Sequence, residues 1–178
     1  MSPAALGGEG RADGAEVITA YSFSKTYAMT GWRLGYLTGP RGLVETVTKV
    51  LESQSSCAPA MAQRAAEAAL TGPQDCVAVM NEAYRRRRDA VVDLLRSAGL
   101  LISIPAGAFY VVADISPTGL ASRDFAFHLL RKRGVSVAPG SAFGEVASAA
   151  VRISLASSDA DLEAGVSQLC NLVQKLSR

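Results

Sequence analysis

One lysine and one arginine stand in a segment whose residue types suit the capture of a phosphorylated aldehyde. Lys25 lies between small hydroxyl residues in the run SFSKTYAMTGWRLGY at 22–36, and Arg33 follows in a Gly-Trp-Arg-Leu-Gly frame. A lysine amine condenses with an aldehyde to form an imine, and serine hydroxyls and a guanidinium are suitable donors to a phosphate. Pyridoxal phosphate is the cofactor that proteins hold in this way.

Two predicted strands would position these side chains. The apolar run 17–22 predicts a buried strand that ends just before the lysine, and 34–38 predicts a second strand with the arginine at its start. A short connection between them would fold both ends toward one place, and Gly31 and Gly35 would let the backbone approach closely there. We therefore expect the lysine and the arginine to converge at one end of the strand pair.

The remaining pattern predicts a mixed α/β chain behind a mobile lead-in at 1–15. Helices are expected over 43–51, from Pro59 to about Gly72, over roughly 77–97, from an N-cap at Ser122 to Gly134, and from an N-cap at Ser158 to Leu176. Further strands are expected at 102–104 with 109–115 as a strand pair or a bent strand, at 135–137 and at 151–155. The predicted fold class is therefore α/β.

A second arginine has the surroundings of a carboxylate-binding residue. Val151, Ile153 and Leu155 fall on one face of their predicted strand, so Arg152 points to the other face. An arginine that faces a cleft can bind a carboxylate through two parallel hydrogen bonds, which a lysine cannot do. The alternative for Arg152, as for Arg33, is a structural ion pair, because charged groups inside folds are usually paired.

Four segments, in order along the chain, resemble a known family. They are SFSKTYAMTGWRLGYLTGP at 22–40, GAFY at 107–110, PGSAFG at 139–144 and RISLA at 152–156. Together they resemble the class I/II aminotransferases, the fold-type-I pyridoxal-phosphate enzymes related to aspartate aminotransferase. The resemblance implies that Lys25 is the Schiff-base lysine and proton shuttle, that Ser22, Ser24 and Arg33 bind the cofactor phosphate, and that Arg152 binds the substrate α-carboxylate.

The same resemblance implies that the chain is the C-terminal part of the pyridoxal-phosphate transferase fold. Members of the family are usually more than twice as long and carry further cofactor ligands upstream. We therefore expect residues 1–88 to be a remnant of the large cofactor-binding domain, with the end of its sheet, and residues 89–178 to be the α/β small domain. The first two strands would have few sheet neighbours, so pairing with a missing N-terminal half, or a homodimer, is expected.

The function implied is amino-group transfer between an amino acid and a 2-oxo acid. Two alternatives stay open: a non-catalytic aminotransferase-derived fragment or interaction domain, and a related fold-type-I lyase or synthase. A serine acyl-enzyme built on S-x-x-K is a weaker interpretation of the serine at 22, because those enzymes also need an S-D-N motif and a K-T-G motif.

Composition limits the other partners. The chain has 18 Lys and Arg against 16 Asp and Glu, a net charge of +2 that gives no reason to expect nucleic acid or a membrane as a partner. Cys57, Cys76 and Cys170 form no C-x-x-C pair, which favours a reducing, cytoplasmic setting. With His128 as the single histidine, we expect no metal site.

Four consecutive arginines, 85–88, invite a nucleic-acid interpretation. Consecutive helical residues spread around most of the circumference, and Glu82 and Asp89 have the spacing of local ion-pair partners. We therefore predict a solvated helix with local pairs.

Overall fold

A computed structural model describes residues 17–177, which fall into two compact units. The first unit ends at Val79 and the second begins at Met80, within the long helix α5 (Asp75–Ser97). The lead-in predicted at 1–15 lies outside the described residues. No helix in the described part of the chain is long and apolar enough to cross a membrane.

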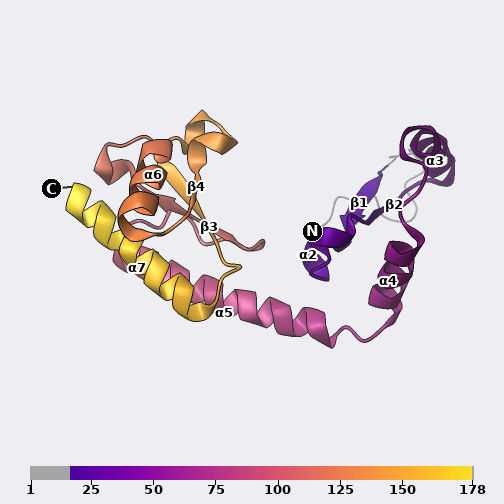
Figure 1. Ribbon diagram of the computed structural model, residues 1–178, viewed down its shortest axis with the longest axis horizontal. Helices are drawn as coiled ribbons and strands as arrows, with labels where there is room; N and C mark the ends of the chain where they lie inside the picture. The colour runs from indigo at the N-terminus through magenta and orange to yellow at the C-terminus, as the bar shows by residue number, and fades with distance from the viewer. Residues whose placement is uncertain (1–16, 178) are drawn as a thin grey trace. The chain divides into compact units, whose positions relative to one another are not determined.

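The first unit is built on an antiparallel strand pair (Figure 1). Its elements are β1 (Thr19–Ser22), α2 (Phe23–Thr26), the 3₁₀ turn η1 (Thr30–Trp32), β2 (Gly35–Thr38), α3 (Arg41–Ser55) and α4 (Ala60–Thr71). The register runs from Thr19 opposite Thr38 to Ser22 opposite Gly35. Both predicted strands are present, although each begins later than expected, so that Arg33 lies before β2 and not at its first residue. The burial expected for the first strand is wrong, because three of the four residues of β1 are exposed.

The core of the first unit is small. Phe23 and Met29 pack against Ala66 of α4, while α3 has no buried residue. Apolar side chains of the strand pair remain open: Tyr21 is 43% exposed and Leu37 is 37% exposed. The described residues of this unit therefore leave part of the apolar surface of the strand pair uncovered. A two-stranded ribbon is also only marginally stable by itself.

The second unit contains a three-stranded antiparallel sheet in the order β3-β5-β4 (Figure 1). Its elements are the second part of α5, β3 (Tyr110–Asp114), η2 (Ser116–Thr118), α6 (Ser122–Arg133), β4 (Ala138–Pro139), η3 (Gly140–Phe143), η4 (Glu145–Ala147), β5 (Ala150–Ser154) and α7 (Asp159–Leu176). β3 pairs with β5 from Tyr110 opposite Ser154 to Asp114 opposite Ala150. The mixed α/β class and all five predicted helices are confirmed.

One face of this sheet is buried under helices. Val111 of β3 and Val151 and Ile153 of β5 share one hydrophobic cluster with side chains of α5, α6 and α7. Successive residues of a strand point to opposite faces, so Arg152 lies on the uncovered face, where it is half-buried. The predicted orientation of Arg152 is confirmed. Ser158 is also confirmed as the N-cap of α7, since its Oγ accepts a hydrogen bond from the Asp161 amide at 3.2 Å.

The predicted N-cap at Ser122 is wrong. The residue that caps α6 is Ala121, and Ser122 is the first helical residue, fully buried. Its Oγ instead accepts a hydrogen bond from the Ser141 amide at 3.1 Å. The hydroxyl therefore anchors the neighbouring turn η3 and does not serve its own helix.

Two predicted strands are absent from residues 17–177. The segment 135–137 is not a strand, because Val135 and Val137 pack on the core and β4 begins only at Ala138. The segment 102–104 forms no strand either: Ile102 and Ile104 are more than half exposed, and only a single bridge joins Leu101 to Ala113. Apolar residues beside a sheet can show the sequence pattern of a strand although their backbone forms no ladder of hydrogen bonds with it.

Candidate functional site

Lys25 lies in the short helix α2, directly after β1. The Oγ of Ser22 caps this helix by accepting a hydrogen bond from the Ser24 amide at 3.1 Å. Phe23 turns into the core, and its amide donates to the carbonyl of Leu34 at 3.2 Å. Lys25 is exposed. The end of the strand pair thus presents the lysine on its surface while the residue two positions earlier fixes the backbone.

Arg33 ends the turn η1 in a left-handed conformation, with φ of 51°. Its Nη1 donates to the carbonyl of Thr30 at 3.0 Å. Ala28, in the same loop, also has a positive φ, of 53°. A non-glycine residue pays about 1–3 kcal/mol for such a backbone, and strained positions of this kind cluster at functional sites. The positive φ angles of Ala28 and Arg33 therefore mark this loop as a candidate functional site.

The two glycines of the loop differ in role. A Cβ on Gly35 would lie 2.5 Å from the carbonyl oxygen of Tyr21, so only glycine allows the strands to approach this closely. A Cβ on Gly31 would meet nothing within 4 Å. The predicted close approach is confirmed at Gly35 and wrong at Gly31, which lies in the open turn η1.

Helix α4 supports the lysine loop, a feature that sequence reasoning missed. Phe23 and Met29 of the loop pack against Ala66. The hydroxyl of Tyr27 donates to Oε1 of Gln74 at 3.1 Å. The alanine-rich face of α4 indicates that another element packs there, because small side chains let a second backbone approach. The sequence does not show which element that is.

Four of the predicted site residues lie at one end of the β1–β2 pair, in the segment 22–33, the hairpin end. Ser22 and Ser24 supply hydroxyl groups, Lys25 supplies an amine, and Arg33 supplies a guanidinium with only one N–H bond directed at the protein backbone. Hydroxyl and guanidinium groups bind phosphate, and an amine captures an aldehyde, so this donor set fits pyridoxal phosphate. Within residues 17–177, no three His, Cys, Asp or Glu side chains are grouped so that they could hold a metal ion.

Arg152, the remaining predicted residue, lies in the second unit between aromatic side chains. Its Cζ is 4.0 Å from the ring centre of Tyr110 and 4.5 Å from that of Phe143. Neither Arg152 nor Arg33 forms an ion pair within the described range 17–177, so the structural ion pair considered for them is not found there. No carboxylate among the described residues therefore neutralises the charge of Arg152.

The arginine run 85–88 pairs differently from the prediction. Arg85 does form local ion pairs, with Glu82 at 2.7 Å and Asp89 at 3.6 Å. Arg86 and Arg87 instead both bind Asp159, the first residue of α7, at 2.9 and 2.7 Å. The local pairing with Glu82 that the spacing indicated for Arg86 is wrong, because the packing of α7 on α5 supplies the carboxylate of Asp159 instead.

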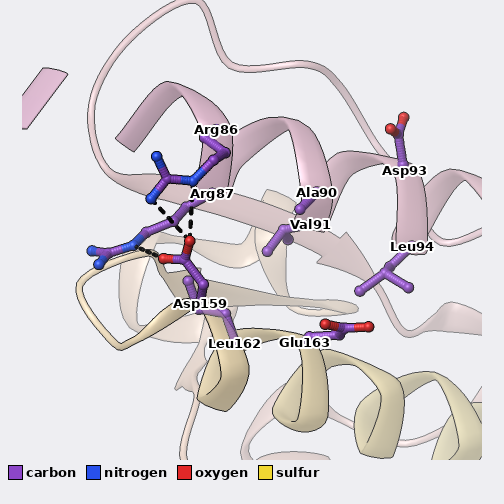
Figure 2. A pocket seen from close by; sticks show the side chains of 9 residues that line it. All are labelled: Arg86, Arg87, Ala90, Val91, Asp93, Leu94, Asp159, Leu162 and Glu163. Carbon is purple, nitrogen blue, oxygen red and sulfur yellow. Dashed lines mark hydrogen bonds and ion pairs between the residues drawn. The ribbon is translucent and has the colours of Figure 1, made fainter. Parts of the chain in front are cut away.

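Figure 2 shows dashed lines that join the Asp159 carboxylate to the guanidinium groups of Arg86 and Arg87. Asp159 is among the residues that line a hollow of about 300 Å³. Val91, Leu94 and Leu162 line this hollow between α5 and α7. The hydrogen bonds from Arg87 and then Arg86 hold the pKa of Asp159 below its ordinary value. Arg86 and Arg87 therefore form a clamp between α5 and α7 through this one carboxylate.

Known proteins resemble the chain over most of its length. The family model for aminotransferases of class I and II matches residues 6–169. An aspartate aminotransferase of Rhizobium meliloti (strain 1021) is 40% identical over 171 residues, which cover 90% of this chain and 41% of the relative. A probable N-acetyl-LL-diaminopimelate aminotransferase of Bacillus subtilis (strain 168) is 38% identical over 154 residues, covering 86% and 39%.

Solved structures agree. The crystal structure of an aromatic aminotransferase from Pyrococcus horikoshii OT3 matches with a TM-score of 0.82 and 38% identity, covering 89% of this chain and 43% of that one. A mutant of Thermus thermophilus aspartate aminotransferase matches with a TM-score of 0.80 and 35% identity, covering 87% and 41%. The chain spans about two fifths of the length of the relatives it matches. Family model, relatives and folds agree that the chain belongs to the class I and II aminotransferases.

Proposed function

We propose that this chain forms part of a pyridoxal-phosphate-dependent aminotransferase that passes an amino group from an amino acid to a 2-oxo acid. The observation that carries the proposal is the donor set of the hairpin end, where Ser22, Ser24, Lys25 and Arg33 share one short loop. Proteins of this family generally depend on pyridoxal phosphate, and the donor chemistry of the loop suits that cofactor.

Each residue of the loop has a separate task in this proposal. When bound, pyridoxal phosphate supplies an electron sink for the carbanion that forms at the substrate α-carbon. The Nζ of Lys25 provides the point of covalent attachment and then carries a proton to and from that carbon. The hydroxyls of Ser22 and Ser24 and the guanidinium of Arg33 bind the phosphate.

Arg152 would bind the carboxylate that amino acids and 2-oxo acids share. A guanidinium presents two parallel N–H donors that match the two oxygens of a carboxylate. The half-buried position and the lack of an ion pair within the described residues support this role. Relatives are named for aspartate, arginine and aromatic amino acids, so the proposal names the substrate class and not one member.

A partner chain belongs to the proposal. The apolar groove between the strand pair and α3, lined by Tyr21, Tyr36, Val47 and Leu51 among others, has no cover from the described residues of the first unit. We propose that the remaining part of the enzyme, as a separate N-terminal half or within a homodimer, covers it. The partial coverage of the relatives supports this arrangement.

The free thiols of Cys57, Cys76 and Cys170 support a cytoplasmic setting for the assembly.

The proposal is tested by proton exchange at the substrate α-carbon. The purified chain, with pyridoxal phosphate in D₂O, is given a panel of amino acids, and NMR follows the loss of each α-proton signal. The account predicts exchange above the rate of free cofactor, lost in Lys25→Ala and kept in Lys49→Ala, a control at an exposed lysine of α3.

The competing functions give other results. Exchange without transfer of nitrogen to pyruvate or 2-oxoglutarate would indicate a lyase or synthase. Exchange that persists unchanged in Lys25→Ala would contradict the role of the lysine. No exchange in any preparation would leave the non-catalytic fragment as the better account of the pure chain.

A further inference from the structure

We propose that Tyr110 and Phe143 are positioning residues that hold the guanidinium of Arg152 between two aromatic rings and leave its N–H edge open for a carboxylate. The nature of the ligand rests on the proposed function, whereas the clamp itself rests on the geometry of the second unit. Both ring centres lie within 4.5 Å of Cζ, well inside the range of a cation–π contact.

Strand register places Tyr110 beside the arginine. Arg152 lies opposite Val112 in the β3–β5 ladder, so Tyr110 is its diagonal neighbour on the same face of the sheet. The alternate residue Val111 is 1% exposed and points into the core. The inner wall of the clamp is therefore part of the sheet.

Phe143 comes from the turn η3, which contacts with η4 and with α6 hold in place. A Cβ on the buried Gly140 would lie 2.1 Å from the carbonyl oxygen of Ala147, so the backbones of η3 and η4 meet there without a side chain. The Ser141 amide donates to Oγ of the buried Ser122. The turn thus carries Phe143 over the arginine although its ring is 57% exposed.

The two rings approach the guanidinium from separate directions. Rings stacked on one side of a single carbon at these distances would touch each other, yet the aromatic contacts of the described residues include none between Tyr110 and Phe143. Arg152 forms no side-chain hydrogen bond within residues 17–177, and no buried side-chain nitrogen there lacks a partner. The nitrogens of Arg152 therefore reach solvent between the rings.

This arrangement favours a planar anion. Ring faces attract the cation but accept no in-plane hydrogen bond, so the donors stay directed outward along the edge of the guanidinium. A carboxylate offers two acceptor oxygens to that edge, whereas a primary amide offers one oxygen and places N–H groups against N–H groups. The two rings would also restrict the rotation of the Arg152 side chain before a ligand binds. Less side-chain entropy would then be lost on binding than for an exposed arginine.

The inner ring is itself supported. Tyr110 contacts Phe109 at 4.1 Å between ring centres, Phe109 contacts Tyr84 of α5 at 5.9 Å, and the guanidinium of Arg87 lies over Tyr84. Arg87 is the same residue that binds Asp159 in Figure 2. A continuous row of side chains therefore connects the helix clamp to Arg152.

NMR of the arginine side chains tests the clamp without any ligand. In the ¹⁵N-labelled full chain, ring currents should move the Arg152 Nε–H proton upfield from the shifts of exposed arginines. Phe143→Ala and Tyr110→Leu should each move it back toward those shifts. The control Val146→Ala removes a fully exposed side chain from the adjacent turn η4 and should leave it in place. Phe143 is exposed, so its removal leaves the core intact.

Titration of the same samples with sodium acetate, and with acetamide as the neutral control, tests the ligand. The Nε–H signal of Arg152 should respond to acetate and not to acetamide, and Phe143→Ala should weaken acetate binding about three- to tenfold. Tyr110→Phe, which keeps the ring, should bind acetate as the unmodified chain does.

The outcomes separate the two ideas. Equal acetate affinity in the unmodified chain and in Phe143→Ala, with normal Nε–H shifts, would overturn the clamp and leave the proposed function standing. Upfield shifts without any response to acetate would overturn the carboxylate role of the clamp and, with it, the place of Arg152 in the proposed function.

Discussion

Among the described glycines of the second unit, Gly140 leaves the least room for an added Cβ. A Cβ there would lie 2.1 Å from the Ala147 carbonyl oxygen and 2.5 Å from that of Ala150. We expect Gly140→Ala to destabilise the second unit by about 1–3 kcal/mol, because backbone must shift to relieve the overlap. Hydrogen exchange of the β5 amides measures this. Gly107→Ala, where a Cβ meets nothing within 4 Å, is the control, and equal effects of the two would contradict the packing described.

Cys170 differs from the other two cysteines in accessibility. It is 9% exposed in α7, and burial raises the pKa of its thiol, whereas Cys57 and Cys76 are exposed. Because the thiolate is the reactive form, we expect iodoacetamide at pH 8 to alkylate Cys170 at least about tenfold more slowly than the other two. Mass spectrometry of the peptides measures the rates. In urea the three rates should converge, and a fast native reaction at Cys170 would show that α7 is not packed as described.

At the scale of elements, the clamp between α5 and α7 should make stability depend on pH. Hydrogen bonds from Arg87 and Arg86 lower the folded-state pKa of Asp159, whereas an unfolded aspartate has a pKa of about 3.9. The contribution is therefore present above about pH 4 and is lost as pH falls through the folded value. The difference in unfolding free energy between the chain and Asp159→Asn should be constant from about pH 7 to pH 5 and shrink below about pH 4.

Denaturant titrations at several pH values measure that difference. Glu163→Gln is the matched control, since Glu163 also lines the hollow on α7 but forms no ion pair with another described residue. If the difference in unfolding free energy between the chain and Asp159→Asn grew as pH fell toward 3, it would contradict a folded-state pKa of Asp159 that Arg87 and Arg86 lower.

Elements that carry their own local signals could be predicted from the sequence. The helix from Ser158 has a capping serine and a regular apolar stripe, and the alternation around Arg152 fixes which face of β5 it occupies. Features that depend on a distant partner could not be predicted. Ser122 bonds to a turn far along the chain, and Arg86 reaches Asp159, which sequence spacing does not reveal. The aromatic wall around Arg152 was missed for the same reason, because Phe143 approaches it only through the fold.

At the scale of the whole molecule, the two units should differ in stability. The second unit has one large buried cluster, whereas the described residues of the first unit, from 17 on, bury few side chains and leave the strand pair open. We expect amides of β1 and β2 to exchange with deuterium at least about tenfold faster than those of β3 and β5 in the isolated chain, because local opening follows buried contact. Hydrogen exchange with mass spectrometry measures this. Equal protection in both sheets would contradict an uncovered first unit.

The central claim is that the hairpin end holds a phosphorylated aldehyde through Lys25 and Arg33. The most direct measurement is to incubate the chain with pyridoxal phosphate, reduce it with borohydride and map the modified lysine by mass spectrometry. The account predicts a label concentrated on Lys25, weakened in Arg33→Ala and by added phosphate, and unaffected in Lys49→Ala. Pyridoxal without its phosphate should label poorly. A label spread evenly over the lysines, with no dependence on Arg33, would contradict the account.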